Sequence, residues 1–170
     1  AVLETEGQIL TYDGNPITAT FFSNGNGYTE NAEALWKDAY PYLKSVASPW
    51  DEQAPQFEER ISIPIKDFEN KLGVNLKSSE TVGKIVERTP GKRVAKVDIN
   101  GKQFTGIQIR EMLNLRSTDF SWVMQGDAVI ITTRGYGHGV GMSQWGANGM
   151  AKDGKTYDEI VKHYYHLIHI

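Results

Sequence analysis

The sequence predicts an α+β fold. Residues 84–99 alternate apolar and polar side chains, which is typical of half-buried strands. Residues 64–72 and 156–168 instead place their apolar side chains at helical intervals. Because no internal repeat or low-complexity linker interrupts the chain, we expect one domain over residues 1–170. A mixed or antiparallel β-sheet with short helices should form either one compact body or two lobes around a cleft.

The composition excludes several classes of function. The 170 residues carry 18 basic and 21 acidic side chains, so the basic surface of a nucleic-acid-binding protein is missing and we expect no nucleic-acid partner. The absence of cysteine excludes disulfides, thiolate metal sites and cysteine nucleophiles. No apolar run is as long as a membrane span. Because the chain starts without Met and soon reaches a predicted strand, we expect Ala1 to be an internal cut in a longer protein.

The first third of the chain predicts a hairpin and a helix. Residues 8–12 and 17–22 form the arms of the hairpin, because Asp13-Gly14 between them favours a tight turn. A polar, glycine-rich loop follows. Asn31 is then expected to cap a helix that runs until Pro41 ends it. Residues 48–59 are predicted to form a loop.

The middle of the chain is predicted to form helices over residues 64–72 and 106–115, and strand pairs over residues 84–99 and 120–134. Ser62, which precedes Pro64, is interpreted as the start signal of the first helix, and Gly73 as its end. Turns are expected at Pro90-Gly91 and Gly126-Asp127.

The last part of the chain begins with an unusual segment, because seven of the 20 residues from 135 to 154 are glycine. A helix from Met142 to Met150 is expected to end it. The final helix, over 156–168, starts with a capping box made by Thr156 and Glu159. Its buried stripe is predicted at Ile160, Val161, Tyr164 and Leu167.

The alternating glycines at 135, 137, 139 and 141 do not fit the glycine motifs of known chemistry. A dinucleotide fingerprint would need glycine at position 140 or 142, where the chain has Val and Met, and a phosphate-binding P-loop would need Gly-Lys-Ser/Thr. A nucleophile elbow around Ser143 fails because Trp145 stands where its second glycine belongs. Ser143 is better interpreted as the cap of the helix that follows.

Histidines leave two interpretations open. His138, within the glycines, either hydrogen-bonds a sugar and moves protons, or is a turn residue bonded to the backbone; we favour the functional interpretation. His163, His166 and His169 could hold a metal, but histidines near a helix C-terminus are also stabilised by the helix dipole. We favour the dipole and expect no metal site.

Aromatic side chains point to sugar recognition. Four tryptophans and eight tyrosines are many for 170 residues, and rings beside polar loops can stack on sugars. Tyr28, Tyr136 and Trp145 flank the glycine-rich loops, so they are candidates for the wall of a cleft. Trp122 lies in a predicted strand and is assigned to the core.

Several segments together resemble one known family. The segments 135–151 and 157–165 look like the signature of the SpoIID family, which is also found in amidase-enhancer proteins of the LytB type. Residues 21–36 resemble that family's serine- and glycine-rich loop before Thr-Glu. Residues 2–22 and 104–120 resemble its preceding hairpin and its linker into the last strands. The resemblance covers nearly the whole chain.

The resemblance implies cleavage of the glycan strands of peptidoglycan. Family members are lytic transglycosylases, in which one glutamate first protonates the bridging oxygen and then assists formation of a 1,6-anhydro end. That glutamate lies in an upstream segment with no counterpart between Ala1 and Ile170. We therefore assign no catalytic residue and expect no glycan cleavage by this chain alone. Some clostridial relatives hold zinc in the loop that matches 22–31, but Phe22 and the lack of cysteine argue against it here, so no metal and no cofactor are expected.

The positions that match the family's cleft supply the candidate substrate-binding residues, with hydrogen bonds to N-acetyl and hydroxyl groups as their expected role. They are Ser23, Gly27, Tyr28, Thr29, Glu30, Tyr136, His138, Gly139, Ser143 and Gln144. For Glu30 a second interpretation stays open, because a carboxylate at the start of a helix is stabilised by the dipole without any ligand.

The resemblance also implies a setting for the longer protein. It would be extracytoplasmic and membrane-anchored, in the space between the mother-cell and forespore membranes, with peptidoglycan glycan strands, the amidase SpoIIP and the membrane protein SpoIIM as partners. A non-catalytic glycan-binding or amidase-enhancing module and a purely structural partner domain are the alternatives. If truncation exposes an apolar face, a homodimer is expected.

Overall fold

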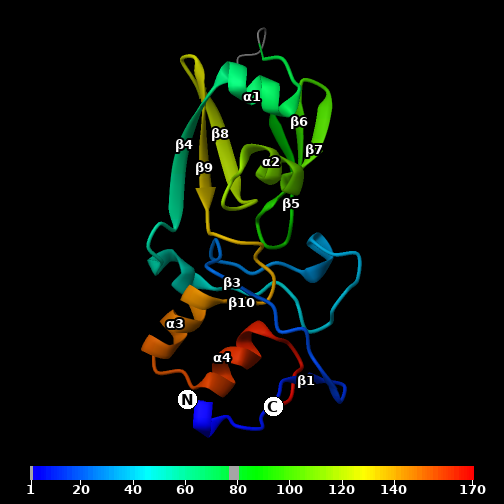
Figure 1. The fold of residues 1–170 in the computed structure, drawn as a ribbon, viewed down its shortest axis with the longest axis vertical. Coiled ribbons are helices and arrows are strands. Elements are labelled where there is room, and N and C mark those ends of the chain that lie inside the picture. The colour runs from blue at the N-terminus through cyan, green and yellow to red at the C-terminus, as the bar shows by residue number, and fades with distance from the viewer. Residues whose placement is uncertain (1, 77–80) are drawn as a thin grey trace.

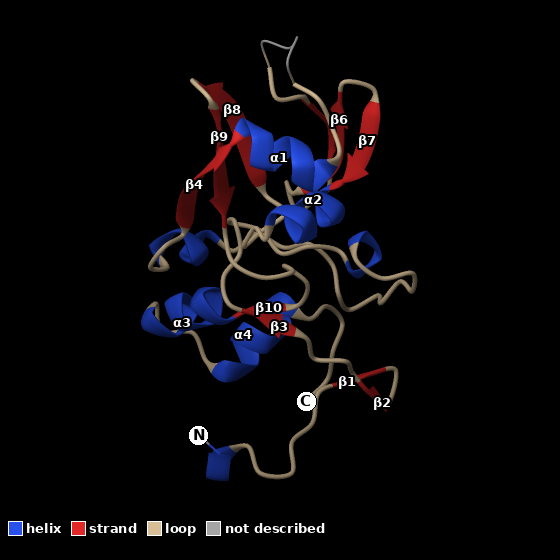
Figure 2. Ribbon diagram, turned by 45° about the horizontal axis from the view of Figure 1, so that its top comes forward, coloured by secondary structure: helices blue, strands red, loops and turns tan. Residues whose placement is uncertain are grey.

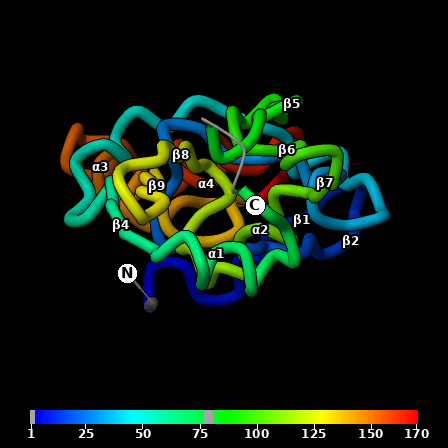
Figure 3. Tube along the Cα trace, turned by 90° about the horizontal axis from the view of Figure 1, so that it is seen from above, coloured from blue at the N-terminus to red at the C-terminus, as the bar shows by residue number. Residues whose placement is uncertain are grey.

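The molecule has two lobes, each with its own hydrophobic core (Figure 1). The structure is a computed structural model and describes residues 2–76 and 81–170. The chain starts in the lower lobe, crosses to the upper lobe for residues 58–134 and returns to complete the lower lobe. Figure 3 looks down on the upper lobe, with the blue and orange segments of the lower lobe beneath it. The α+β prediction is confirmed.

The upper lobe is built from two antiparallel sheets and two helices. The first sheet has the order β4-β9-β8 and the second β5-β6-β7. Helices α1 and α2 contact each other, α1 also packs on the first sheet, and α2 packs on the second. The elements are β4 (Glu58–Pro64), α1 (Ile65–Leu72), β5 (Lys84–Arg88), β6 (Val94–Ile99), β7 (Lys102–Thr105), α2 (Gly106–Leu113), β8 (Phe120–Gln125) and β9 (Ala128–Arg134).

Local signals explain the upper-lobe helices. Helix α1 buries Phe68 and Leu72 and ends at Gly73, whose φ of 61° closes the helix in the left-handed conformation. Helix α2 begins with a capping box between Thr105 and Gln108. Both helices and the strands of the two predicted pairs are therefore confirmed. Trp122 packs against the upper core, as expected.

Two strands of the upper lobe, β4 and β7, are not predicted by the sequence pattern. Ser62 does not start a helix but lies within β4, which pairs with β9 from Glu58–Arg134 to Pro64–Ala128. Strand β7 follows the turn after β6. Every second residue of β4 is exposed and the others are only half-buried, so its alternation is too weak to separate it from a loop.

The lower lobe combines short strands with two helices, as Figure 2 shows. Helices α3 and α4 pack together beside the parallel pair β3–β10. Its elements are β1 (Thr11–Tyr12), β2 (Asn15–Pro16), β3 (Phe21–Phe22), β10 (Met142–Ser143), α3 (Gln144–Lys152) and α4 (Tyr157–Tyr164), with 3-10 turns at Val2–Glu4, Ala32–Ala34 and Pro49–Gln53. Ser143 caps α3 and the Thr156–Glu159 capping box starts α4, as predicted.

Three expectations for the lower lobe are wrong. The helix expected from Asn31 is a single 3-10 turn, because the Asn31 side chain accepts from the Ser45 N–H and does not cap. The predicted hairpin arm over 17–22 is not formed, because Phe21–Phe22 pairs with Met142–Ser143. Leu167 is 75% exposed with a φ of 55°, since the chain leaves α4 to pair His169 with Thr11.

The 3-10 turn Val2–Glu4 and the C-terminus lie in the lower part of the lower lobe (Figure 1). Within residues 2–76 and 81–170, no helix is long and apolar enough to cross a membrane.

Candidate functional site

Two loops of the lower lobe run side by side beneath the upper lobe. We call residues 20–31 the first loop and residues 135–143 the second loop. Asn24 and Tyr136 exchange backbone hydrogen bonds of 3.2 and 2.8 Å, and the Glu30 N–H donates to the Gly139 carbonyl over 2.7 Å. The structure thus brings together the two loops that the sequence analysis assigned to one cleft.

The alternating glycines allow this close approach. Gly135, Gly137, Gly139 and Gly141 all have positive φ, between 78° and 120°. A Cβ at Gly139 would lie 2.5 Å from Arg93 Nε, and a Cβ at Gly141 would overlap the Thr20 carbonyl oxygen. The glycines are therefore required by packing of the second loop against the first loop and against Arg93.

A pocket of about 180 Å³ opens between the lobes. The lower lobe contributes Glu30, Leu35 and His138 to its lining, and the upper lobe contributes Thr89, Arg93 and Thr118. It is the place where the second loop, the first loop and the turn between β5 and β6 meet.

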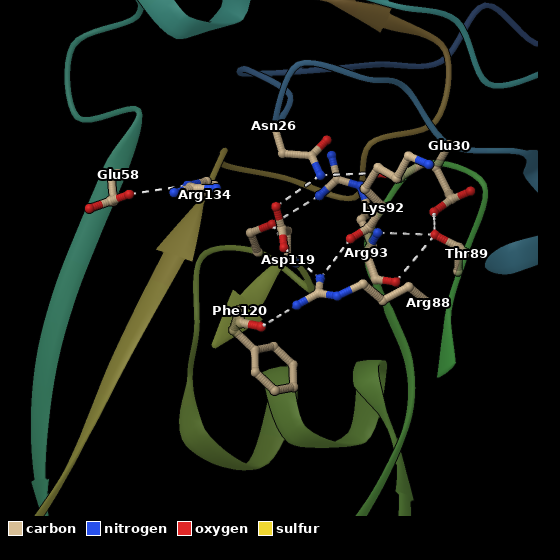
Figure 4. A network of polar contacts seen from close by, with 12 residues as sticks. Asn26, Glu30, Glu58, Arg88, Thr89, Lys92, Arg93, Asp119, Phe120 and Arg134 are labelled. Carbon is tan, nitrogen blue, oxygen red and sulfur yellow. Dashed lines mark hydrogen bonds and ion pairs between the residues drawn. The ribbon is translucent and has the colours of Figure 1, made fainter. Parts of the chain in front are cut away.

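Glu30 is buried at the junction of the lobes, with only 2% of its surface exposed. Its Oε2 accepts from the Thr89 hydroxyl and its Oε1 accepts from the Asn31 N–H over 2.9 Å, as Figure 4 shows for Thr89. A Cβ at Gly91 would lie 2.8 Å from Oε2, so glycine is needed there. Since no α-helix begins at this point, the helix-dipole interpretation of Glu30 loses its basis.

Arg93 lies next to Glu30 and is also 2% exposed. Its Nη1 donates to Ser117 Oγ over 2.9 Å, whereas Nε and Nη2 have no hydrogen-bond partner in the described part of the chain. Burial lowers the pKa of the guanidinium, and the nearby carboxylates of Glu30, Asp119 and Asp51 oppose that shift. Acidic groups from both lobes therefore stabilise the charged form of Arg93.

A second set of polar contacts ties the first loop to the upper lobe. Asp119 accepts from Asn26 Nδ2 over 3.0 Å and from Arg88 Nη1 over 2.8 Å, and Arg88 also donates to the Phe120 carbonyl (Figure 4). Asn26 donates in addition to the Gly91 carbonyl. These bonds fix the turn between β5 and β6 over the first loop.

The hydrogen bonds of His138 favour the second of its two interpretations, that of a turn residue bonded to the backbone. Its Nδ1 accepts from the Val140 N–H and its Nε2 donates to the Phe21 carbonyl, both over 3.1 Å. Burial lowers its pKa, although the Phe21 carbonyl favours the protonated form. Because the backbone occupies both nitrogens of a neutral ring, His138 is suited to line the pocket with its ring and not to move protons.

The other predicted residues divide into exposed and internal ones. Tyr28, Tyr136 and Gln144 are exposed and Ser23 is half-buried. The side chains of Thr29 and Ser143 are buried from solvent and bonded within the chain. Thr29 accepts from the Val46 N–H, and the Ser143 hydroxyl donates to Asp51. Gly27 and Gly139 are buried backbone positions. Thr29, Ser143 and the glycines shape the loops, and the exposed residues remain available to a ligand.

Four polar residues between the lobes are not predicted by the sequence pattern: Arg93, Thr89, Asn26 and Asp119. The residues 88–93 were interpreted only as a hairpin turn, and no local pattern signals that an arginine there is buried. The C-terminal histidines are not gathered: His163 Nε2 lies 2.8 Å from the Ala47 carbonyl, and the His169 backbone pairs with Thr11. Among the described residues, no three histidine or carboxylate side chains are grouped to hold a metal ion.

Asp51 gives the lower lobe a pH-dependent stability. Burial raises its pKa, and the hydrogen bond from Ser143 only partly opposes this. Because its pKa is raised, Asp51 binds its proton more tightly in the folded state than in the unfolded state, which stabilises the folded state at low pH. This stabilisation is complete below the ordinary pKa of 3.8 and is lost as the pH rises through the folded-state pKa. The free energy of unfolding should therefore fall relative to that of Asp51→Asn as the pH rises above the ordinary pKa of 3.8 in urea titrations. Asp158→Asn, which alters an exposed pair with Lys162, is the control; a pH-independent difference for Asp51→Asn would contradict the assignment.

Sequence comparisons identify relatives of the chain. No protein-family model matches the chain. It is 58% identical over 165 residues to stage II sporulation protein D of Bacillus subtilis (strain 168), which covers 97% of the chain. It is 55% identical, over all 170 residues, to the protein of the same name from Bacillus amyloliquefaciens. The chain is thus closely similar to SpoIID proteins over nearly its whole length. Both of these relatives are named for sporulation.

The match covers only part of the SpoIID relatives. The chain spans about half of their length, 48% and 49% respectively. It is also 28% identical, over 97% of its residues, to the amidase enhancer of Bacillus subtilis, of which it covers 31%.

Proposed function

We propose that this chain forms the glycan-binding part of a SpoIID lytic transglycosylase that cleaves peptidoglycan strands during engulfment of the forespore. The pocket between the lobes is the observation that carries the proposal. It joins the two family-like loops with a buried carboxylate and a buried guanidinium, which are groups that hydrogen-bond sugars. Both oxygens of Glu30 already accept hydrogen bonds from the chain itself, so we assign it the role of shaping the pocket, and we assign the catalytic glutamate to another part of the longer protein.

The setting of the longer protein is part of the same proposal. We infer an extracytoplasmic, membrane-anchored protein in the space between the mother-cell and forespore membranes, working beside a SpoIIP-like amidase and a SpoIIM-like membrane protein. The support for this is the close similarity to SpoIID proteins, which are named for sporulation.

The chain is tested with purified glycan strands from which the stem peptides have been removed. Co-sedimentation measures binding, and mass spectrometry of the soluble products detects 1,6-anhydromuramoyl ends. We expect the chain to bind strands without forming such ends, and the longer protein to form them. Anhydro ends from the chain alone would place the acid within these residues, with Glu30 as the first residue to mutate. Failure of both proteins to bind strands would reject the proposal.

Tyr136 should contribute to glycan binding by stacking. It is 50% exposed at the start of the second loop, and the Arg116 guanidinium lies 5.4 Å from its ring centroid. Tyr136→Ala is expected to weaken strand binding about tenfold, because stacked aromatic rings carry much of the energy of such sites. Tyr157→Ala removes a ring that is 49% exposed at the start of α4 and serves as the matched control. Equal losses in the two variants would show that Tyr136 has no special role.

Stimulation of an amidase is the second candidate function, favoured by the similarity to the amidase enhancer. The chain is added to a purified peptidoglycan amidase, and the release of stem peptides is measured. Faster release, without strand binding by the chain alone, would favour this alternative. Unchanged release together with strand binding would favour the glycan-binding role.

A further inference from the structure

Strand β4 forms an open edge of the upper lobe, as Figure 1 shows. Over Glu58–Pro64 it pairs with β9, on one side only. Every second residue of an edge strand points its N–H and C=O groups away from the sheet, and no other backbone group of the described chain bonds these groups in β4. The opposite edge of the same sheet is contacted by β5, because the Phe120 carbonyl of β8 accepts from Arg88 over 3.2 Å. The free edge is therefore the one at β4.

A groove of about 720 Å³ runs beside β4. One wall is β4 itself, where Ile61 and Ile63 pack against the upper core but stay half-buried. The other wall comes from α1 and from the end of α2, and it includes the apolar side chain of Leu113. Because Lys71 and Asn114 in this wall are exposed, the groove is accessible without any movement of the lobes. An apolar groove beside a free strand edge is an arrangement that accepts an extended polypeptide as an additional strand.

The polar part of the groove carries an excess of positive charge. Its cations are Lys71, Arg110 and Arg116, and its acids are Glu59 and Asp67. Glu59 already has a partner, since it pairs with Arg116 over 3.0 Å. Lys71 has no ion pair in the described part of the chain, and Arg110 uses only Nε, which donates to a backbone carbonyl. Two cations and one acid are left, so the groove favours a ligand with carboxylate side chains.

A second copy of the chain fits this groove poorly. Pairing β4 with the β4 of another copy about a two-fold axis would bring the same cations to both sides of one groove. Glu59, which lines the groove at the strand edge, and Pro64, which lacks an N–H, are features by which edge strands avoid indiscriminate pairing. The edge is therefore suited to a different polypeptide that supplies the opposite charge.

We propose that β4 and this groove form the docking site for an extended, carboxylate-bearing segment of a partner protein. The segment adds a fourth strand to the sheet β4-β9-β8: its main chain bonds the free edge of β4, its apolar side chains contact Ile61 and Leu113, and its carboxylates meet Lys71 and Arg110. The inference goes beyond the proposed function and does not depend on it, because the groove and the pocket between the lobes share no lining residue.

The probe is the capped peptide acetyl-Glu-Thr-Val-Thr-Val-Thr-Glu-amide, which is titrated into the ¹⁵N-labelled chain. We expect saturable amide shifts centred on Glu58–Pro64 and on residues 113–116. The analogue with lysine in place of both glutamates should bind at least about tenfold more weakly. Two further analogues are N-methylated either at the valines or at the threonines. Only one of these sets of N–H groups can face β4, so one analogue should lose binding and the other should keep it.

Three results would overturn the proposal. Equal binding of the two N-methylated analogues would show that no strand is added at β4. Shifts centred outside the groove, or no saturable shift at millimolar peptide, would show that the groove does not take an acidic extended segment. Concentration-dependent shifts in β4 without any peptide would identify a second copy of the chain as the occupant.

A charge variant tests the groove from the side of the protein. Lys71→Gln removes one cation of the groove and should weaken binding of the acidic peptide about fivefold. Lys66→Gln makes the same change at an exposed position of the same helix that does not line the groove, and it is the control. Thermal unfolding of both variants checks that they fold. Unaltered peptide binding by a folded Lys71→Gln protein would contradict the assignment of carboxylates to this groove.

Discussion

Gly141→Ala is expected to lower the free energy of unfolding by about 3 kcal/mol or more. Gly141 has a φ of 84°, which costs an alanine about 1–2 kcal/mol. A Cβ there would also overlap the Thr20 carbonyl and lie 2.6 Å from Thr20 Oγ1. Because the Met142 N–H donates to that same carbonyl, the clash should separate β3 from β10. Urea unfolding measures the loss.

Gly154→Ala is the matched control for this prediction. Gly154 has nearly the same φ, 85°, but no atom lies within 4 Å of a Cβ at that position. Its replacement should cost only the conformational strain, about 1–2 kcal/mol. Equal effects of the two substitutions would mean that the second loop does not need its close approach to the first.

Arg93→Met is expected to destabilise the protein by about 2–3 kcal/mol, because it removes the hydrogen bond to Ser117 and the nearby cation that offsets the buried Glu30 carboxylate. Methionine keeps much of the side-chain volume, so the loss reports mainly on charge and hydrogen bonding. Adding Glu30→Gln to Arg93→Met should recover part of the loss, since it removes the uncompensated charge. Denaturant unfolding of the single and double variants measures both effects.

Arg134→Met tests whether any arginine would behave in this way. Arg134 forms an ion pair with Glu58 in which both side chains are largely exposed (Figure 4). Its replacement should change the free energy of unfolding by less than about 1 kcal/mol. If Arg93→Met lowered the free energy of unfolding by as little as Arg134→Met, the Arg93 guanidinium would not be needed to compensate the buried carboxylates.

Elements with local stop and start signals were predictable from the sequence. Gly73 ends α1, Thr156 and Glu159 start α4, and the turn at Gly126-Asp127 joins two paired strands. Elements that depend on distant partners were not. Asn31 has the residue type of a cap, but its side-chain oxygen accepts from the Ser45 N–H further along the chain.

The candidate site was predictable only in part, for the same reason. The resemblance to the SpoIID family pointed to both loops, and the structure places them side by side. The role of Arg93 depends on Gly139, which lies far along the chain and leaves room for the guanidinium. His138 has the residue type of a proton carrier, yet two backbone groups occupy its nitrogens. Such pairings cannot be inferred from the local sequence.

The central claim, that glycan binds between the lobes, is tested most directly by NMR mapping of the ¹⁵N-labelled chain with peptide-free glycan strands. We expect the backbone amide shifts to concentrate in the first loop, the second loop and residues 88–94. Saturable shifts confined to these three segments would support the account. Shifts centred elsewhere, such as on the exposed face of α4, or no shifts at saturating strand concentration, would contradict it.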